Sequence, residues 1–256
     1  MKKILCAVLA VVLCLCLVAC GGEQKDAMAL YKSAMTKVDK ENMAAKMTIN
    51  MAVEAGTEAV NVDMDLDVAA KKTGSDTTMA MQMKVGAQGM TIDMGMYLAD
   101  GYYYMDILGM KVKQSLEQAD EDLTGQLSDI SGKLLLDSDA ITIEKSEKKD
   151  GNTVISFTVS ADKMNELVKL LNSQAMDDAS NITVESVAGT VTIDSSENLV
   201  AETMDITYSM EAEGVKTQAS MTMKMTDIQF GDSVKVELPD NLDEYVESDD
   251  ATGFDL

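Results

Sequence analysis

The feature that most constrains the fold is an alternation of apolar and polar residues with a period of two. Val60, Val62 and Met64, for example, alternate with Asn61 and Asp63. Successive side chains of a strand point to opposite faces, so each such segment predicts a strand with one apolar face and one polar face. The pattern recurs at residues 47–53, 60–68, 79–85, 90–98, 102–107, 140–145, 154–160, 182–194, 199–212 and 215–228. It is typical of an antiparallel sheet with one side in water.

Three segments between these strands have a helical period instead. Ala27 and Ala34 share a face within residues 26–42, a second apolar stripe runs through residues 115–136, and Asp162 is placed to cap a third helix. The sequence therefore predicts an α+β fold in one domain. We expect a single curved antiparallel sheet, a half-barrel of about ten strands, whose apolar concave face is covered by about three helices.

The N-terminus has the pattern of an export signal. Lys2 and Lys3 precede a continuous apolar run over residues 4–19, which is short for a membrane span. Residues 17–20 read Leu-Val-Ala-Cys and resemble the bacterial lipobox. The resemblance implies cleavage before Cys20, whose thiol then carries a diacylglycerol. An uncleaved signal anchor is the alternative.

The cysteines agree with this interpretation, because all four lie at Cys6, Cys14, Cys16 and Cys20, within or at the edge of the signal. We expect a signal peptide at residues 1–19, a lipid-anchored tether at 20–25, a folded domain at 26–247 and a disordered acidic tail at 248–256. The expected location is the outer face of the cell membrane, in a Gram-positive bacterium.

Composition excludes several functions. The chain has no His, and every one of its 21 basic residues is Lys. Ser-His and Cys-His nucleophile pairs and His-ligated zinc are therefore excluded. A net charge of -23 argues against a nucleic-acid partner. We expect no catalytic residue, no metal and no cofactor, and we expect Asp63, Asp65 and Asp67 to form a solvated strand face, since no calcium-loop Gly and Glu follow them.

The 22 methionines lie mostly at apolar strand positions. They are either an ordinary packed core or a flexible lining for a cavity that binds an apolar ligand. Sheltering a long acyl chain contributes on the order of 10 kcal/mol before costs, at about 0.8 kcal/mol per methylene. Copper(I) sites usually add Cys or His, which are missing here. The candidate ligand-binding residues are Met47, Ile49, Met51, Met64, Leu66, Met79, Met81, Met83, Met94, Met96, Met204, Ile206, Met210, Met221, Met223 and Met225.

The order of elements behind the lipobox, with the ending Val236-Glu237-Leu238-Pro239 and then Tyr245, resembles the lipoprotein-carrier (LolA-like) superfamily. This group includes the periplasmic carrier and outer-membrane receptor of lipoprotein localisation and the mycobacterial lipid-binding lipoproteins. The chain is also similar to small lipoproteins of Gram-positive bacteria. The resemblance implies a half-barrel with helices in its concave face and an apolar cavity between. Because the chain has no arginine, arginine-dependent features of the carriers do not transfer.

Two functions are consistent with these patterns. The first is a non-enzymatic, membrane-anchored lipoprotein that binds or carries a lipid or other apolar ligand. The second is a structural or interaction lipoprotein of the cell envelope, with a packed interior and a protein partner. An enclosed apolar cavity favours the first and close packing favours the second.

Overall fold

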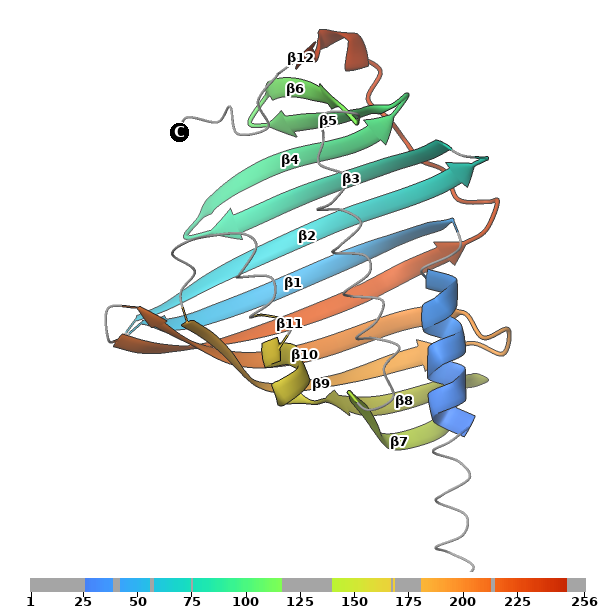
Figure 1. Ribbon diagram of the computed structural model, residues 1–256, viewed down its shortest axis with the longest axis vertical. Helices are drawn as coiled ribbons and strands as arrows, with labels where there is room; N and C mark the ends of the chain where they lie inside the picture. The colour runs from blue at the N-terminus through green and yellow to red at the C-terminus, as the bar shows by residue number, and fades with distance from the viewer. Residues whose placement is uncertain are drawn as a thin grey trace, which may run out of the picture.

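The computed structural model describes residues 26–38, 42–55, 58–74, 76–116, 140–166, 168, 181–212 and 215–247. Within these ranges the strands form a single open, curved sheet in the order β12-β6-β5-β4-β3-β2-β1-β11-β10-β9-β8-β7 (Figure 1). Neighbours pair antiparallel except β12 and β6, which are parallel. The strands are β1 (Met43–Ala55), β2 (Glu58–Thr73), β3 (Asp76–Ala87), β4 (Met90–Ala99), β5 (Tyr102–Ile107), β6 (Met110–Ser115), β7 (Ile141–Lys149), β8 (Asn152–Val159), β9 (Asn181–Ile193), β10 (Leu199–Ala212), β11 (Val215–Phe230) and β12 (Val246–Glu247).

Tight hairpin turns set the order of the sheet. Four of the connections have only two residues between the paired strands, and both of those residues have positive φ, as a type I′ turn requires. The turns are Gln88-Gly89, Asp100-Gly101, Leu108-Gly109 and Asp150-Gly151. Two meanders, β1 to β6 and β7 to β11, result, and the pairing of β1 with β11 joins them into one sheet.

The expected single curved antiparallel sheet is confirmed, but the expected count of about ten strands was too low. The two strands that were missed are β6 and β12. β6 has only two strongly apolar residues, Met110 and Val112, and its turn has Leu108 where Asn or Asp is usual. β12 is a two-residue pairing with a strand far away in sequence, which no local pattern announces.

Two α-helices fall within the described residues, at 26–38 and at 161–168, with residue 167 not described. A short 3₁₀ helix, η1 (Leu242–Glu244), follows near the C-terminus. The helix expected at 115–136 cannot begin at Ser115, because that residue ends β6. The remainder of that segment, and the expected third helix beyond residue 168, lie outside the described residues.

The principal core lies between the first helix and one end of the sheet. Ala27, Tyr31, Ala34 and Met35 recur at helical spacing and are buried. They belong to one cluster with buried side chains of β7 to β10, and Figure 1 shows the helix in blue across these strands. The residues of that cluster on the strands are Ile141, Ile143, Ile155, Phe157, Val159, Val184, Val187, Val191, Ile193 and Leu199.

The helix is also fixed by polar contacts at the β9 to β10 turn. Lys37 Nζ donates to the Ser196 carbonyl at 2.6 Å and to Asn198 Oδ1 at 3.1 Å. Ser33 Oγ donates to Glu197 Oε2 at 2.5 Å. The helix is therefore held to the sheet by both its apolar face and its polar edge.

Candidate functional site: an apolar sheet face with one buried carboxyl group

The structure places all sixteen candidate ligand-binding residues on one face of the sheet. Cross-strand partners point to the same side, and Met204 pairs with Met223, which also pairs with Ile49. We call this set the methionine face. It consists of Met47, Ile49, Met51, Met64, Leu66, Met79, Met81, Met83, Met94, Met96, Met204, Ile206, Met210, Met221, Met223 and Met225.

The methionine face is continuous with the surface that the first helix covers. Phe157 pairs with Gly189, and Gly189 pairs with Met204, so the row runs directly from the packed core into the methionine face. Burial changes along this row. Phe157 is 1% exposed, whereas every one of the sixteen side chains is half-buried. On this face of the sheet, the large cluster of fully packed described residues therefore lies under the helix, and the methionine face is a region of lower burial beside it.

Glu202 is a charged residue on this same face. It pairs with Val191 on one side and Met225 on the other, and it is 7% exposed. A register shift between Leu199 and Ala201 places both Leu199 and Glu202 inward, which simple alternation would not do. Because burial penalises the charged form, the pKa of Glu202 rises from 4.5 to about 7.

Tyr31 places a second polar group in the same region. Its ring packs against Phe157, with centroids 5.4 Å apart, and the residue is fully buried. Its hydroxyl is buried and has no hydrogen-bond partner among the described residues. Burial raises the pKa of Tyr31, and the nearby charge of Glu202 raises it further. No described group donates a hydrogen bond to the Glu202 carboxylate.

Sequence reasoning missed Glu202, although a signal was present. Glu202 has the same parity as Met204 and Ile206, so the alternation that assigned those two residues to the apolar face also assigns Glu202 to it. An acidic residue at an apolar strand position is an exception of the kind that marks functional sites. Cys20, the expected lipid anchor, lies outside the described residues.

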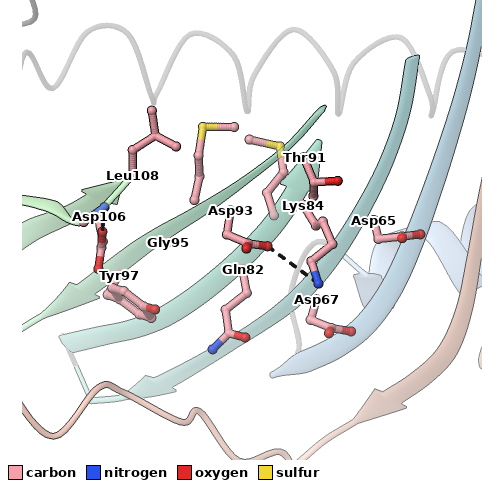
Figure 2. Close-up of a pocket in the computed structure, with 13 residues that line it drawn as sticks. Asp65, Asp67, Gln82, Lys84, Thr91, Asp93, Gly95, Tyr97, Asp106 and Leu108 are labelled. Atoms are coloured by element: carbon pink, nitrogen blue, oxygen red, sulfur yellow. Dashed lines mark hydrogen bonds and ion pairs between the residues drawn. The ribbon is translucent and has the colours of Figure 1, made fainter. Parts of the chain in front are cut away.

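The opposite face of the sheet is polar and contains an open hollow of about 740 Å³ over β2 to β5 (Figure 2). Its lining includes Asp65 and Asp67 and the ion pair of Lys84 with Asp93, at 3.6 Å. Tyr97 lies over Gly95, where a Cβ would come within 2.6 Å of the tyrosine oxygen. Asp63, Asp65 and Asp67 are all exposed, as expected for a solvated strand face.

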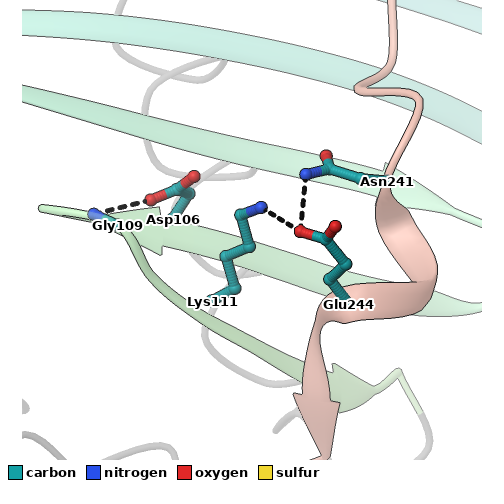
Figure 3. Close-up of polar contacts among 5 residues, drawn as sticks. All are labelled: Asp106, Gly109, Lys111, Asn241 and Glu244. Atoms are coloured by element: carbon teal, nitrogen blue, oxygen red, sulfur yellow. Dashed lines mark hydrogen bonds and ion pairs between the residues drawn. The ribbon is translucent and has the colours of Figure 1, made fainter.

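The C-terminal segment, residues 231–247, closes the far end of this polar face. Tyr245 packs edge-on against Tyr104, with ring centroids 5.3 Å apart. Figure 3 shows Lys111 and Asn241 both donating to Glu244, at 2.5 and 2.8 Å. These hydrogen bonds hold the pKa of Glu244 below its ordinary value. The segment therefore packs against the polar face of the sheet, opposite the methionine face.

Two further properties bear on the chemistry of the described residues. They contain no cluster of three or more acidic or cysteine side chains arranged to hold a metal ion. None of the helices that they form is both long and apolar enough to cross a membrane.

Several solved structures are similar to this chain at low identity. The ywiB protein from Bacillus subtilis has 8% identity and a TM-score of 0.25, with 73% of this chain and 93% of that chain covered. A DUF1329 family protein from Desulfovibrio piger has 9% identity and a TM-score of 0.29, with coverage of 83% and 95%. A LolA superfamily protein from Nitrosomonas europaea has 10% identity and a TM-score of 0.28, with coverage of 83% and 94%.

Sequence comparison with curated proteins yields no match. A family model described as a family of unknown function, DUF6612, matches residues 25–244. This range begins one residue before the first helix and ends at η1, so it includes both meanders, the helix and the methionine face. The chain therefore belongs to the DUF6612 family.

Proposed function

We propose that this protein is a membrane-anchored extracytoplasmic lipoprotein that binds a lipid or similar apolar ligand on its methionine face, without catalysing a reaction. The observation that carries the proposal is the combination of residue type and burial on that face. Sixteen apolar side chains, most of them methionine, lie together and all remain half-buried, beside a core that is fully packed. Flexible thioether side chains adapt to apolar ligands of irregular shape.

Composition supports the non-enzymatic part of the proposal. With no His and no Arg in the chain, the commonest general base and the guanidinium group that often stabilises anionic intermediates are missing. The anchoring part follows from the lipobox and from charge. An acidic chain with a net charge of -23 gains nothing from an anionic bilayer, so attachment depends on the acyl chains of Cys20.

Ligand binding is tested with the chain from Gly21 onward, purified without detergent and examined by native mass spectrometry. We expect bound lipid in the wild-type protein. The double variant Met81→Gln with Met223→Gln keeps side-chain length but adds polar groups to the face, and should weaken binding of a fluorescent fatty acid by at least about tenfold.

Met90→Gln is the matched control, since Met90 is 69% exposed and lies outside the candidate set. It should bind as the wild type does, and circular dichroism should show all three proteins folded. A wild-type protein that carries no lipid and takes up no fatty acid contradicts the proposal. That result would favour the second candidate, an envelope lipoprotein with a filled interior. The observation that supports this second candidate is the packed core under the helix.

Anchoring is tested separately by metabolic labelling with a palmitate analogue. The wild-type chain should incorporate the label and fractionate with membranes, because two acyl chains suffice for stable attachment. Cys20→Ala should abolish labelling, while Cys16→Ala, within the apolar run, should not. Equal labelling of the wild type and Cys20→Ala would show that Cys20 is not the lipidated residue.

A further inference from the structure

Two polar groups lie inside an otherwise apolar region, and the described residues do not satisfy them. Tyr31 is fully buried, and its hydroxyl has no hydrogen-bond partner in the described part of the chain. Glu202 is 7% exposed and receives no hydrogen bond from a described group. Leaving a buried polar group unpaired costs about 1–3 kcal/mol, and a charged group costs more. Two such groups in one place therefore call for a partner that the described part of the chain does not supply.

The two groups are neighbours although they come from distant parts of the chain. Tyr31 lies on the first helix and belongs to the same buried cluster as Val191, the strand partner of Glu202 on β10. The charge of the carboxylate accordingly raises the pKa of the tyrosine. No hydrogen bond joins them directly. A small polar group of a ligand placed between them would interact with both.

The pair lies at the boundary between the packed core and the methionine face. Glu202 pairs with Met225, and Met225 pairs with Met47, so an apolar chain on the methionine face would extend directly from it. Glu202 continues the alternation of Met204 and Ile206, and the register shift between Leu199 and Ala201 brings Leu199 to the same face beside it.

The chemistry of the pair selects the kind of group that fits. A carboxylate only accepts hydrogen bonds, whereas a phenol both donates and accepts. A head group that donates hydrogen bonds therefore satisfies Glu202, and a cationic one also offsets its charge. An anionic head group would place two like charges together at a site with little exposure to water.

We propose that Glu202 and Tyr31 form a polar subsite at the edge of the methionine face, which binds the head group of an amphiphile that donates hydrogen bonds, a primary ammonium best of all. This inference rests on the proposed apolar-ligand function and gives the ligand a chemical class. Its apolar chain lies along the methionine face and its head lies between the helix and β10.

The test uses the full chain in phosphatidylcholine nanodiscs, with isotope-labelled methionine methyl groups observed by NMR. Dodecylamine, dodecanol and dodecanoate are titrated in turn, and each is referenced to its partitioning into empty nanodiscs. The methyl groups of Met204 and Met225 report on the subsite, because both residues lie beside Glu202. The variants are Glu202→Gln and Tyr31→Phe, which keep side-chain shape, and Glu54→Gln on an exposed strand position is the control.

At about pH 8, dodecylamine should bind the wild type at least about tenfold more tightly than dodecanoate. Glu202→Gln should reduce this preference to within about twofold, and Tyr31→Phe should weaken binding of dodecylamine and dodecanol by about threefold or more. Lowering the pH through 7 should weaken dodecylamine binding in the wild type, because Glu202 then becomes protonated. Among the described titratable groups, Tyr31 is the one whose pKa the charge of Glu202 raises, and it stays protonated throughout this range.

The outcomes separate this inference from the proposed function. Equal binding of all three amphiphiles, or a preference that survives in Glu202→Gln, overturns the subsite while leaving the apolar-ligand function standing. A wild-type protein whose methionine methyl signals respond to none of the amphiphiles overturns both. Circular dichroism of each variant in the same nanodiscs verifies that the sheet is intact.

Discussion

Replacing Glu202 with glutamine is expected to stabilise the folded protein at about pH 8 by about 3 kcal/mol relative to the wild type, and to have little effect near pH 4.5. Burial raises the pKa of Glu202 from 4.5 in the unfolded chain to about 7 in the fold. Each unit of difference corresponds to about 1.4 kcal/mol between the protonation states. Glutamine keeps the shape of the protonated side chain and never ionises.

The direction of the pH dependence follows from proton counting. Between about pH 4.5 and 7 the folded wild type retains a proton on Glu202 that the unfolded chain has released. Its stability therefore falls across that window as the pH rises, and this contribution is constant above about pH 7. Carboxylates with lowered pKa values, such as Asp194 and Glu244, act in the opposite direction but equally in both proteins. They cancel when the variant is compared with the wild type.

Urea unfolding of the chain from Gly21 onward, followed by circular dichroism at several pH values, measures this difference. The control is Glu54→Gln, which makes the same change at an exposed strand position and should not alter the pH profile. If Glu202→Gln and the wild type lose stability in parallel from pH 4.5 to 8, Glu202 does not titrate in a buried environment, and the polar subsite loses its basis.

Replacing Phe157 with alanine is expected to lower the free energy of unfolding by about 3–5 kcal/mol. The ring is 1% exposed and lies at the centre of the core under the helix, against the ring of Tyr31. It also fills the space above Gly189, where a Cβ would overlap the ring. Removing the ring therefore leaves a cavity that the helix and β9 border from opposite sides, and the rigid sheet cannot collapse into it.

A double-mutant cycle tests this packing. Gly189→Ala alone should cost about 1–3 kcal/mol, because the added methyl group displaces the Phe157 ring. In the Phe157→Ala background the same change should cost almost nothing, since the space is empty. Additive effects of the two substitutions in urea unfolding would show that ring and glycine do not share this contact. Phe157→Leu, which restores most of the volume, should recover much of the lost stability.

Most of the sheet was predictable from residues close in sequence. The alternation of Val62 and Met64 with Asp63 specifies a strand and its two faces without any tertiary information. The same alternation places the methionine residues on one common face of the sheet. β6 was missed because Lys111 and Lys113 leave it little apolar signal, and its turn begins with Leu108 in place of the usual Asn or Asp.

The candidate site was only partly predictable, and Glu202 shows why. Its parity with Met204 was visible in the sequence, but parity alone does not say that the side chain is buried. Burial depends on the first helix, which brings Tyr31 from more than a hundred residues away. The register shift at Leu199 is likewise a property of the pairing between β9 and β10, and so cannot be read from either strand alone.

The sequence by itself determined the class of fold, the two chemically distinct faces of the sheet and the shortage of catalytic side chains, because these depend on composition and on a period of two residues. Only the tertiary structure decided that the described residues form a sheet of twelve strands, that the principal core lies at its β7 to β10 end, and that a carboxyl group is buried near Tyr31. These features arise where segments distant in sequence pack together. The desolvation of Glu202 depends on how the first helix packs against the sheet, so neither segment alone determines it.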